Sequence, residues 1–511
     1  MGVAIVAPKI SDKQLETLRA AGMTPIIAPR ASAFEGASTS RRMRGWGTSG
    51  VGPNSAISGS LSNLRNRSHE FVRNHPLAQN AIDTWVSNLV GTGIVPRWKI
   101  NGMVSQELKE RLQKRWLRWT DEADAAGQCD FYGLQALAAR SIVEGGSALI
   151  RRRDRMTADG LQVPLQLQVM EPDHLPHSLT QMHTNGNEIQ MGVEFDWIGR
   201  RAAYHIYRRH PGDQFFNGDA STVRVPAQNM IHAFRQLRPG QIREIPWLST
   251  IVTSLYELDQ YNDAERVRKK IAAMFGAFIT SAADDSGSDI GSDEGEDAAG
   301  RALAGLEPGI IRYLDPGEDV RFAEPADIGG NTIAWLQQQL RECAVGVGLT
   351  YEQLTGDLSN VNYSSLRAGL VEFRRRCEAL VFHVMVFQIN RPIVGWWMDA
   401  LARSGAESLP GYWQNRAEYL DIEWQGCGWE YVNPVDDRIA EQMDIRNGLD
   451  SRQAIIARRR GRDAEEVDKE IAEDNKRADS LRLVLDSDPR QTAQSGALQK
   501  AAEAAVMGGK E

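Results

Sequence analysis

Hydrophobic residues recur every three or four positions in the first strongly patterned part of the chain. This spacing places them on one face of a helix, and it predicts two helices between residues 61 and 89, which Gly91 and Gly93 end. A third helix is predicted over about 105–120, and a fourth over about 131–144 that stops at Gly145-Gly146. The apolar faces of the first three helices consist of Leu61, Leu64, Phe71, Val72, Leu77, Ala81, Ile82, Trp85, Val86, Leu89, Leu108, Leu112, Trp116 and Trp119.

Between Ser147 and Phe234 the apolar residues alternate with polar ones. Alternation is typical of strands with one buried face, and it is clearest at 165–169 and 203–207. Turn-forming pairs such as Asp159-Gly160 and Asn185-Gly186 separate the alternating runs. The pattern predicts a β-rich segment inside a mainly helical chain.

Two long helices then flank a polar segment. The first is predicted from Pro246 to about residue 280, at a length of roughly 50 Å, with a buried stripe from Leu248 to Phe278. The second is predicted over 331–347. Between them, 282–297 contains seven acidic residues and no basic residue, which predicts a mobile loop because like charges repel.

A polar loop follows the second long helix, and a third long helix begins near Asn362, a good cap residue. Pro392 is expected to kink or end that helix. From Asp436 onward the sequence predicts short charged helices and a frayed tail. At the other end, residues 1–58 are predicted to form a flexible basic arm, because their Ala, Ser, Gly and Pro content offers little to bury.

Composition and charge describe an ordinary folded protein. Of 511 residues, 42% are hydrophobic and 25% are charged, and the net charge is −8. This acidic balance argues against a protein whose main task is to grip nucleic acid. The four cysteines form no CxxC pair, which favours a reducing cytoplasm. No run approaches the ~20 apolar residues that a membrane span needs, so no membrane association is expected.

The search for reactive groups gives little. No GxxxxGK[ST] loop and no GxSxG motif is present, so we expect no enzyme activity, no catalytic residue and no cofactor. Asp173-His174-Leu175-Pro176-His177 is the most metal-like run, but its spacing predicts no metal site. The 13 tryptophans are more typical of core or interface anchors than of base-stacking platforms. The run Arg458, Arg459 and Arg460 fits phosphate contacts and a solvated helix end before Gly461 about equally well.

Several short motifs occur in a characteristic order along most of the chain. The most specific are Tyr351-Glu352-Gln353-Leu354-Thr355-Gly356-Asp357-Leu358-Ser359 and Asn362-Tyr363-Ser364-Ser365-Leu366-Arg367. Others are Leu64-Arg65-Asn66-Arg67-Ser68, Val72-Arg73-Asn74-His75-Pro76, Val90-Gly91-Thr92-Gly93-Ile94, Glu171-Pro172-Asp173, Arg238-Pro239-Gly240-Gln241 and Pro434-Val435-Asp436. In this order they resemble the lambda-type portal proteins of tailed bacteriophages, from about Ala33 to Ala472. The chain departs from the family at Glu244, where Gly is usual, and at Thr350, where Pro is usual.

The resemblance implies an α+β fold, a mainly helical portal fold with a β-rich wing subdomain, long stem helices, a small α/β clip and a helical crown. The wing would occupy 59–245, the first stem helix 246–280, the clip 281–330 and the second stem helix 331–348. A tunnel loop over 349–362 would face DNA through Asp357, Ser359, Asn360 and Asn362. A long kinked helix would return through the wing over 363–435, and the crown and a disordered tail would occupy 436–511.

The function that the resemblance implies is mechanical. Portal subunits form a ring, usually of twelve copies, at one capsid vertex, and double-stranded DNA passes through the ring without sequence recognition during packaging and ejection. The expected partners are the large terminase subunit, the major capsid protein and a head-completion or adaptor protein. The expected locations are the virion and, during assembly, the host cytoplasm. Two alternatives stay open on the residues alone: a minor capsid or adaptor protein, and a metal-dependent nucleic-acid enzyme.

Overall fold

The computed structural model describes residues 45–47, 49–213, 221–274, 278–280, 312–314, 331–359, 361–430, 433–483, 485 and 490. The chain divides into two compact units, Met1–Gly52 and Pro53–Glu511, and every element below belongs to the second. The acidic tract 282–297, nearly all of the predicted clip and most of the predicted arm lie outside the described residues. The last six residues of that arm are helical instead: α2 spans Pro53–Ser58, and its Asn54 exchanges hydrogen bonds of 3.0 and 2.9 Å with the backbone of Gly240 and Ile242.

Four helices follow where the hydrophobic periodicity predicts them. Side-chain caps fix two of their starts: Ser105 accepts a hydrogen bond from the backbone of Leu108, and Asp130 accepts one from Gly133. Gly146 ends the fourth helix at a φ of 99°, a left-handed conformation that favours glycine. The helices are α3 (Leu61–Asn74), α4 (Pro76–Leu89), α5 (Gln106–Thr120) and α6 (Phe131–Gly145).

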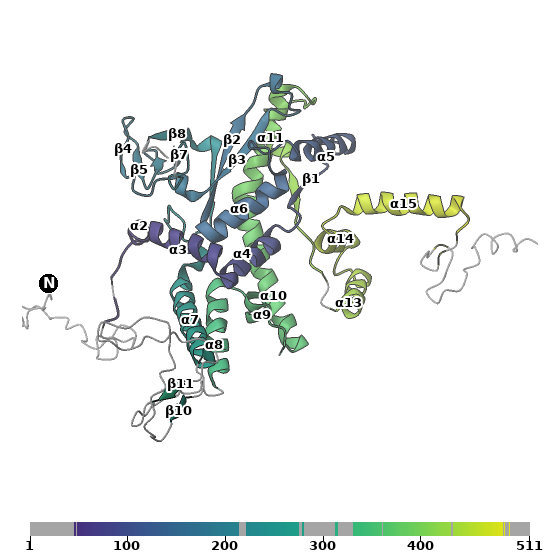
Figure 1. The fold of residues 1–511 in the computed structure, drawn as a ribbon. Helices are drawn as coiled ribbons and strands as arrows, with labels where there is room; N and C mark the ends of the chain where they lie inside the picture. Colours follow the sequence, from purple (N-terminus) through teal and green to yellow (C-terminus); the bar gives the residue numbers. More distant parts are fainter. Residues whose placement is uncertain are drawn as a thin grey trace, which may run out of the picture. The chain divides into compact units, whose positions relative to one another are not determined.

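The β-rich segment forms two antiparallel sheets (Figure 1). The first has the order β3-β2-β9 and consists of β2 (Ser147–Asp154), β3 (Leu165–Met170) and β9 (Met230–Phe234). The second runs β4-β5-β6-β7-β8 and consists of β4 (Gln181–Met182), β5 (Glu188–Gln190), β6 (Val193–Phe195), β7 (Arg201–Tyr207) and β8 (Thr222–Pro226). A third pair joins distant parts of the chain, β1 (Val95–Trp98) with β12 (Ile422–Gln425). The short helical turns η3 (Thr157–Asp159), η4 (Pro172–His174), η5 (Ala227–Asn229) and η6 (Trp247–Thr250) lie in the connections.

A large hydrophobic core lies among α3 to α6, the three-stranded sheet and the later helices, and tryptophans fill its centre. The rings of Trp98, Trp116 and Trp397 lie 5.3–6.1 Å apart in tilted or edge-to-face arrangements, a geometry that aromatic pairs favour. A second, smaller core includes Leu149, Tyr204 and Ile206 and packs the two sheets together. The prediction that the tryptophans are mostly core anchors is confirmed for these rings.

Two long helices pack side by side and extend away from the core (Figure 1). They are α7, Val252–Met274, and α8, Asn331–Val347. The first is shorter than predicted, because Phe278 belongs to strand β10 (Phe278–Thr280), which pairs with β11 (Arg312–Leu314). Aromatic and β-branched residues favour a strand there, and 23 residues of helix measure about 35 Å.

The third long helix has an unusual middle. It begins at Asn362, as predicted, and consists of α10 (Tyr363–Leu380), a π-helical stretch η7 (Val381–Asn390) and α11 (Arg391–Ser404). Pro392 does not end it, because proline occupies the first turn of α11, where its missing N–H is tolerated. Within the described residues, Tyr363–Ser404 is the one stretch whose length and composition suit a membrane span, a test that core helices also pass; its C-terminal half contributes Val384, Ile389 and Trp397 to the core.

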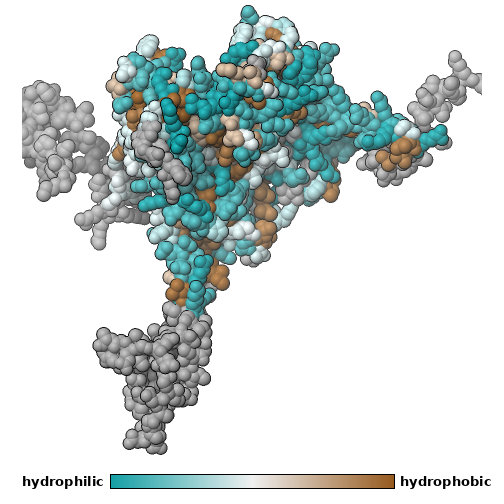
Figure 2. All heavy atoms as spheres, turned by 45° about the horizontal axis from the view of Figure 1, so that its top comes forward, coloured by the Kyte–Doolittle hydropathy of each residue, from teal (hydrophilic) through white to brown (hydrophobic). Residues whose placement is uncertain are grey.

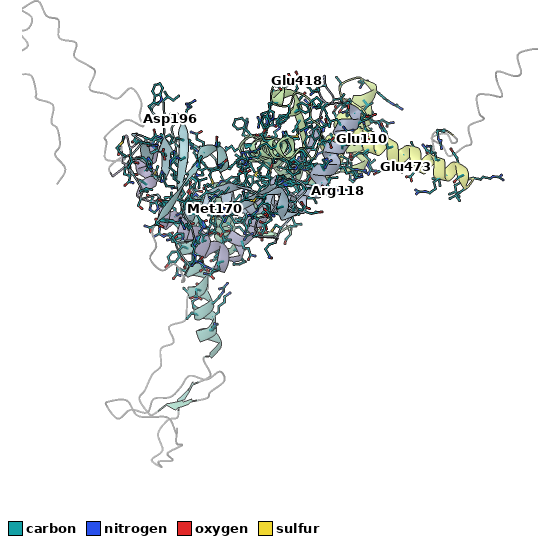
Figure 3. The ribbon with its side chains drawn as sticks, turned by 90° about the horizontal axis from the view of Figure 1, so that it is seen from above. Glu110, Arg118, Met170, Asp196, Glu418 and Glu473 are labelled. Atoms are coloured by element: carbon teal, nitrogen blue, oxygen red, sulfur yellow. The ribbon has the colours of Figure 1, made fainter. Side chains whose placement is uncertain are left out.

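The predicted charged helices near the end of the chain are α13 (Pro434–Arg446), α14 (Arg452–Arg460) and α15 (Ala464–Ser480); short α12 (Arg416–Tyr419) precedes them. Ion pairs attach α15 to the earlier part of the chain: Arg97 to Glu466 at 2.8 Å, and Lys469 to Glu110 at 2.7 Å. Figure 3 shows Glu110 of α5 close to α15. Because exposed ion pairs stabilise little, this attachment is weak compared with the tryptophan core.

Overall, the structure is 55% helical and 13% strand, which confirms the mainly helical α+β class.

Replacing Trp397 with alanine should lower the free energy of unfolding by about 3–5 kcal/mol, because the side chain is fully buried and its removal leaves a cavity. Trp197→Ala is the matched control, since Trp197 is 91% exposed and should change stability by less than about 0.5 kcal/mol. Denaturant titration followed by circular dichroism measures both. Equal losses in the two variants would contradict the assignment of the core.

Candidate functional site

The segment predicted as a tunnel loop, 349–362, is partly helical. Tyr351–Thr355 forms the short helix α9, and Thr350 and Gln353 make a reciprocal capping box at its start. The Thr350 hydroxyl accepts from the Gln353 backbone at 3.3 Å, and the Gln353 side chain accepts from the Thr350 backbone at 3.0 Å. Gly356, at a φ of 72°, then reverses the chain. Threonine at 350, where the family usually has proline, thus has a structural role as a cap.

The polar residues of the loop bind one another. The carboxylate of Asp357 accepts from the backbone and hydroxyl of Ser359 at 3.0 and 2.5 Å, and from the hydroxyl of Tyr351 at 3.2 Å. The Ser359 hydroxyl, with its backbone N–H, lowers the pKa of Asp357, so the group is a carboxylate at neutral pH. Asn362 caps α10 by accepting from the Ser364 backbone at 3.0 Å. The structure therefore brings Asp357 and Ser359 together, whereas Asn362 belongs to the next helix and Asn360 lies outside the described residues.

Side chains from the core hold the base of this segment. The amide of Asn80, on α4, donates to the carbonyl oxygens of Gln353 and Leu354, both at 2.8 Å. Leu354 is fully buried, and Arg376 of α10 donates to the Gly348 carbonyl at 2.5 Å. The base is anchored, Asp357 beyond it is half-buried, and Leu358 and Ser359 are exposed.

The arginine run at the end of α14 is largely engaged within the chain. Arg458 pairs with Asp450 and Arg459 with Glu441, each at 2.5 Å. Arg460 is exposed and has no ion pair among the described residues. Gly461 ends the helix at a φ of 59°, so the run lies at a helix end, where Arg458 and Arg460 are exposed.

Sequence reasoning missed a buried ionic cluster centred on Glu244. Its carboxylate is inaccessible to solvent and lies 2.9 Å from Arg243, 3.4 Å from Arg65 and 3.2 Å from His232. Arg243 also donates to the backbone carbonyls of Leu175 and Met191 at 3.0 and 2.8 Å. The signal in the sequence was the departure from the family at Glu244, which periodicity could not link to Arg65 on another element.

The electrostatics of this cluster follow from its burial. Burial opposes the charge on Glu244, but Arg243 and His232 outweigh that effect and hold its pKa well below its ordinary value. Burial is also the main reason that the pKa of His232 falls to about 4, although Glu244 acts in the opposite direction. At neutral pH the cluster therefore contains charged Glu244 and Arg243 beside a neutral imidazole.

Two further clusters combine histidine and carboxylate side chains. In the first, His69, Glu171 and Asp173 offer ligand atoms within 4.8 Å of one another. In the second, His183, Glu194 and His205 do the same. The metal-like run of the sequence thus contributes Asp173 to a cluster, whereas His174 stacks edge to face with His210.

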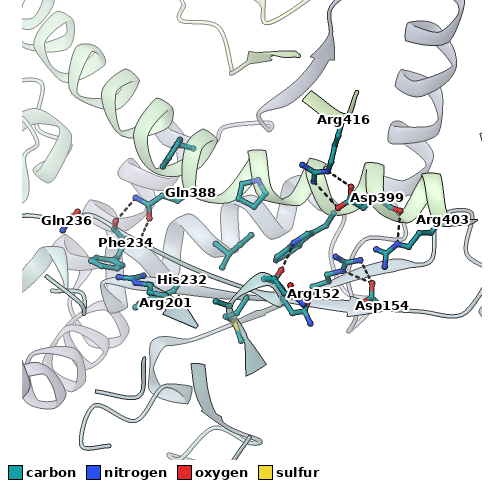
Figure 4. Close-up of a pocket in the computed structure, with 18 of the residues that line it drawn as sticks. Arg152, Asp154, Arg201, His232, Phe234, Gln236, Gln388, Asp399, Arg403 and Arg416 are labelled. Carbon is teal, nitrogen blue, oxygen red and sulfur yellow. Dashed lines mark hydrogen bonds and ion pairs between the residues drawn. The ribbon is translucent and has the colours of Figure 1, made fainter. Parts of the chain in front are cut away.

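A large groove lies between the three-stranded sheet and the η7–α11 helix (Figure 4). It has a volume of about 1060 Å³ and an excess of arginine over acidic side chains. Three of the four arginines have partners inside the groove. Arg416 pairs with Asp399 and Arg152 with Asp154, both at 2.8 Å, and Arg403 donates to the backbone carbonyl of Asp399 at 3.1 Å. Figure 4 shows these pairs as bridges along the groove wall. One pair lies within β2 and the other joins α12 to α11, whereas Gln388 of η7 joins helix to sheet through two hydrogen bonds of 3.1 Å with the backbone of Phe234. The residues that line the groove form no arrangement of nucleophile and base.

Comparison with known proteins assigns the chain to a protein family. The family described as "Phage portal protein, lambda family" matches residues 39–380, more than half of the chain. The chain belongs to the lambda family of phage portal proteins. Relatives include the probable portal protein of Halomonas phage phiHAP-1, 27% identical over 81% of this chain and 80% of that protein. Portal protein B of Escherichia phage lambda is 21% identical over 83% of this chain and 86% of that protein.

Among solved structures, a chain from the neck of the native gene transfer agent (GTA) particle is similar, with a TM-score of 0.40 and 12% identity over 78% of this chain and 92% of that chain. A chain from the virion of the native particle gives a TM-score of 0.39 and 14% identity.

The family match covers α3 to α10, including the loop after Thr350 and the buried Glu244 cluster. The π-helical stretch, α11 and the charged C-terminal helices lie beyond it. This portal family consists of structural proteins rather than enzymes, in line with the sequence, which contains no phosphate-binding loop.

The Asn80→Ala variant should release the base of the 350–359 segment, because it removes both hydrogen bonds to the carbonyls of Gln353 and Leu354. We expect faster hydrogen–deuterium exchange at residues 350–359 in this variant. Asn88→Ala is the control, since the Asn88 amide bonds to Thr84 within its own helix. Unchanged exchange in Asn80→Ala would mean that the segment does not depend on this anchor.

The neutral, buried His232 should make the protein sensitive to acid between pH 6.5 and about 4. Between pH 6.5 and about 4 the unfolded chain binds a proton at His232 that the native protein excludes. Stability should therefore fall as the pH decreases through this window, by up to ~1.4 kcal/mol per pH unit from this group. In His232→Gln, unfolding titrations at a series of pH values should give a shallower slope over the same window. A slope equal to that of the parent would contradict the prediction. His383→Gln is the control, because His383 is exposed on η7, and this variant should keep the slope of the parent.

Proposed function

We propose that this portal subunit assembles with identical copies, twelve in the complete ring, around a channel for double-stranded DNA at one capsid vertex. The ring would conduct DNA during packaging and ejection. In this proposal 59–245 forms the wing, 246–280 and 331–348 the stem, 281–330 the clip, and 436–511 the crown and tail. The helix over 363–435 returns through the wing.

The observation that carries this proposal is the uneven burial of the two long helices. Near the core the same chain covers one face of each helix, as at Leu255 and Val347, although Tyr256 and Val345 on other faces are exposed. Farther out the same helices expose apolar side chains, with Val267 46% and Ile333 70% accessible. Figure 2 shows hydrophobic atoms, in brown, on the surface of the projecting part formed by α7 and α8. Neighbouring copies around a ring would cover such faces, because a repeated head-to-tail contact closes into a ring.

The loop after Thr350 suits a surface past which DNA slides. Its Asp357 is a carboxylate that repels phosphate over a screened range of about 8 Å at physiological salt. Ser359 and Asn362 are exposed polar side chains that can make exchangeable contacts with phosphates or water. We therefore propose 349–362, with Asp357, Ser359, Asn360 and Asn362, as the tunnel loop, and its anchored base would resist displacement by moving DNA.

We assign the other partners by the same mechanical role. A packaging motor, the large terminase subunit, would dock at the clip and supply the ATP hydrolysis. Head-completion or adaptor proteins would replace it after filling, and the major capsid protein would surround the ring. Arg460 is the one residue of the 458–460 run that we propose as a phosphate contact. The ring would assemble in the host cytoplasm and function in the virion.

Assembly provides the test. Purified parent protein should form rings with a central hole in negative-stain electron microscopy, and native mass spectrometry should give a mass of twelve chains. Ile333→Glu should shift the protein to monomers or open fragments, because a charge would be buried at each contact between copies. Met156→Glu is the control, at a side chain that is 75% exposed outside these helices. Parent protein that stays monomeric under all assembly conditions, or rings from Ile333→Glu in normal yield, would overturn the proposal.

A further inference from the structure

His69, on α3, faces a carboxylate on each side. Its Nδ1 lies 2.8 Å from Oε1 of Glu144, so an imidazole with its proton on Nδ1 would donate to that carboxylate. Nε2, the other ring nitrogen, is buried and has no hydrogen-bond partner among the described residues. Histidines that bind metals are oriented in this way, with one nitrogen held by a carboxylate and the other left as a ligand.

Asp173 has a matching arrangement. Its Oδ1 lies 2.9 Å from Arg65, while Oδ2 is buried without a hydrogen-bond partner and lies 3.8 Å from Nε2 of His69. This separation exceeds a hydrogen bond. It is close to the roughly 3.3 Å between two ligands of a tetrahedral ion with bonds of about 2.0–2.1 Å. Two buried atoms without a hydrogen bond therefore face each other, as an ion pair when His69 is protonated. Asp173 and Glu144 raise the pKa of His69 to about 9, so a metal ion bound here would displace a proton from Nε2.

Glu171 supplies a third ligand to this space. Its carboxylate lies within 4.8 Å of the ligand atoms of His69 and Asp173, and its Oε2 is 3.1 Å from Nε2 of His210. A cavity of about 580 Å³, lined by His69, Glu144 and Glu171, leads to the cluster. We propose that His69, Asp173 and Glu171 bind a divalent transition-metal ion of the zinc type, which links α3 to the segment after β3.

The chemistry of the ligands selects the ion. One imidazole with two carboxylates suits Zn²⁺, whereas Ca²⁺ and Mg²⁺ prefer shells made of oxygen alone. Three protein ligands leave a position for water on the cavity side. The site differs from the cluster around Glu194, where Arg224, Asn185, Asn187 and His205 already bind both carboxylate oxygens. The proposed site was not expected from the sequence, because His69 lies about 100 residues before its partners.

Isothermal titration of the full chain with ZnCl₂, after treatment with EDTA and desalting, tests the site. We expect one saturable equivalent per chain, a higher melting temperature with Zn²⁺, and no comparable effect of MgCl₂. All variants carry Cys427→Ser, because an exposed thiol also binds zinc. His69→Gln and Glu171→Gln should each weaken Zn²⁺ binding by at least about tenfold.

His183→Gln is the matched control, since it changes a histidine of the other cluster, and it should bind Zn²⁺ like the parent. Glu171 is exposed, so Glu171→Gln should fold even if His69→Gln does not, and circular dichroism checks both. Absence of saturable Zn²⁺ binding, or parent-like binding by Glu171→Gln, would overturn the site and leave His69 as a protonated partner of Glu144 and Asp173. Binding is measured per chain, so the result does not depend on ring assembly.

Discussion

The buried carboxylate of Glu244 is the constraint on which the arrangement of the folded unit depends. A charge that is inaccessible to solvent is tolerated only when other groups replace its water. Here Arg243, Arg65 and His232 do so, from three different parts of the chain. Arg65 in turn binds Asp173, so the cluster connects α3, β9 and the turn η4. Removing one partner would leave an uncompensated buried charge, which is why these elements must keep their positions together.

Around this cluster, the two hydrophobic cores have different roles. The larger core, with its tryptophans, packs the helices α3 to α6 against the η7–α11 helix, and the smaller core joins the two sheets. Gly146 lies against the ionic cluster, because a Cβ atom on this residue would come within 2.8 Å of Cγ of Glu244. Two segments proposed to function in the ring are attached to the core. Asn80 and Arg376 hold the base of the 350–359 segment, and buried Leu255 holds the start of α7.

The residues that stabilise the fold and the residues that we propose to face DNA are different ones, which suits a channel protein. Residues that hold the fold are largely buried, whereas Ser359 and Asn362 of the proposed tunnel loop are short, polar and exposed. Exposed apolar positions occur on α7 and α8, where contact between copies would cover them, and also on η7 and α13. A protein that moves DNA without reading it needs no base-specific contact, and no reactive constellation was found among the described residues.

The sequence by itself determined the helices α3 to α6, the β-rich segment, the cap at Asn362 and membership of the portal family. These depend on local periodicity, caps and short motifs, which a linear pattern carries. It did not determine the end of α7 at Met274, the continuation of the helix past Pro392, or the short helix within the loop, where local signals compete. Only the tertiary structure decided the partners of Glu244, the pairing of β1 with β12 and the meeting of His69 with Asp173. The contacts of Arg65 with Glu244, of β1 with β12 and of His69 with Asp173 join residues far apart in the sequence. Such contacts arise from packing and charge compensation that no periodicity records.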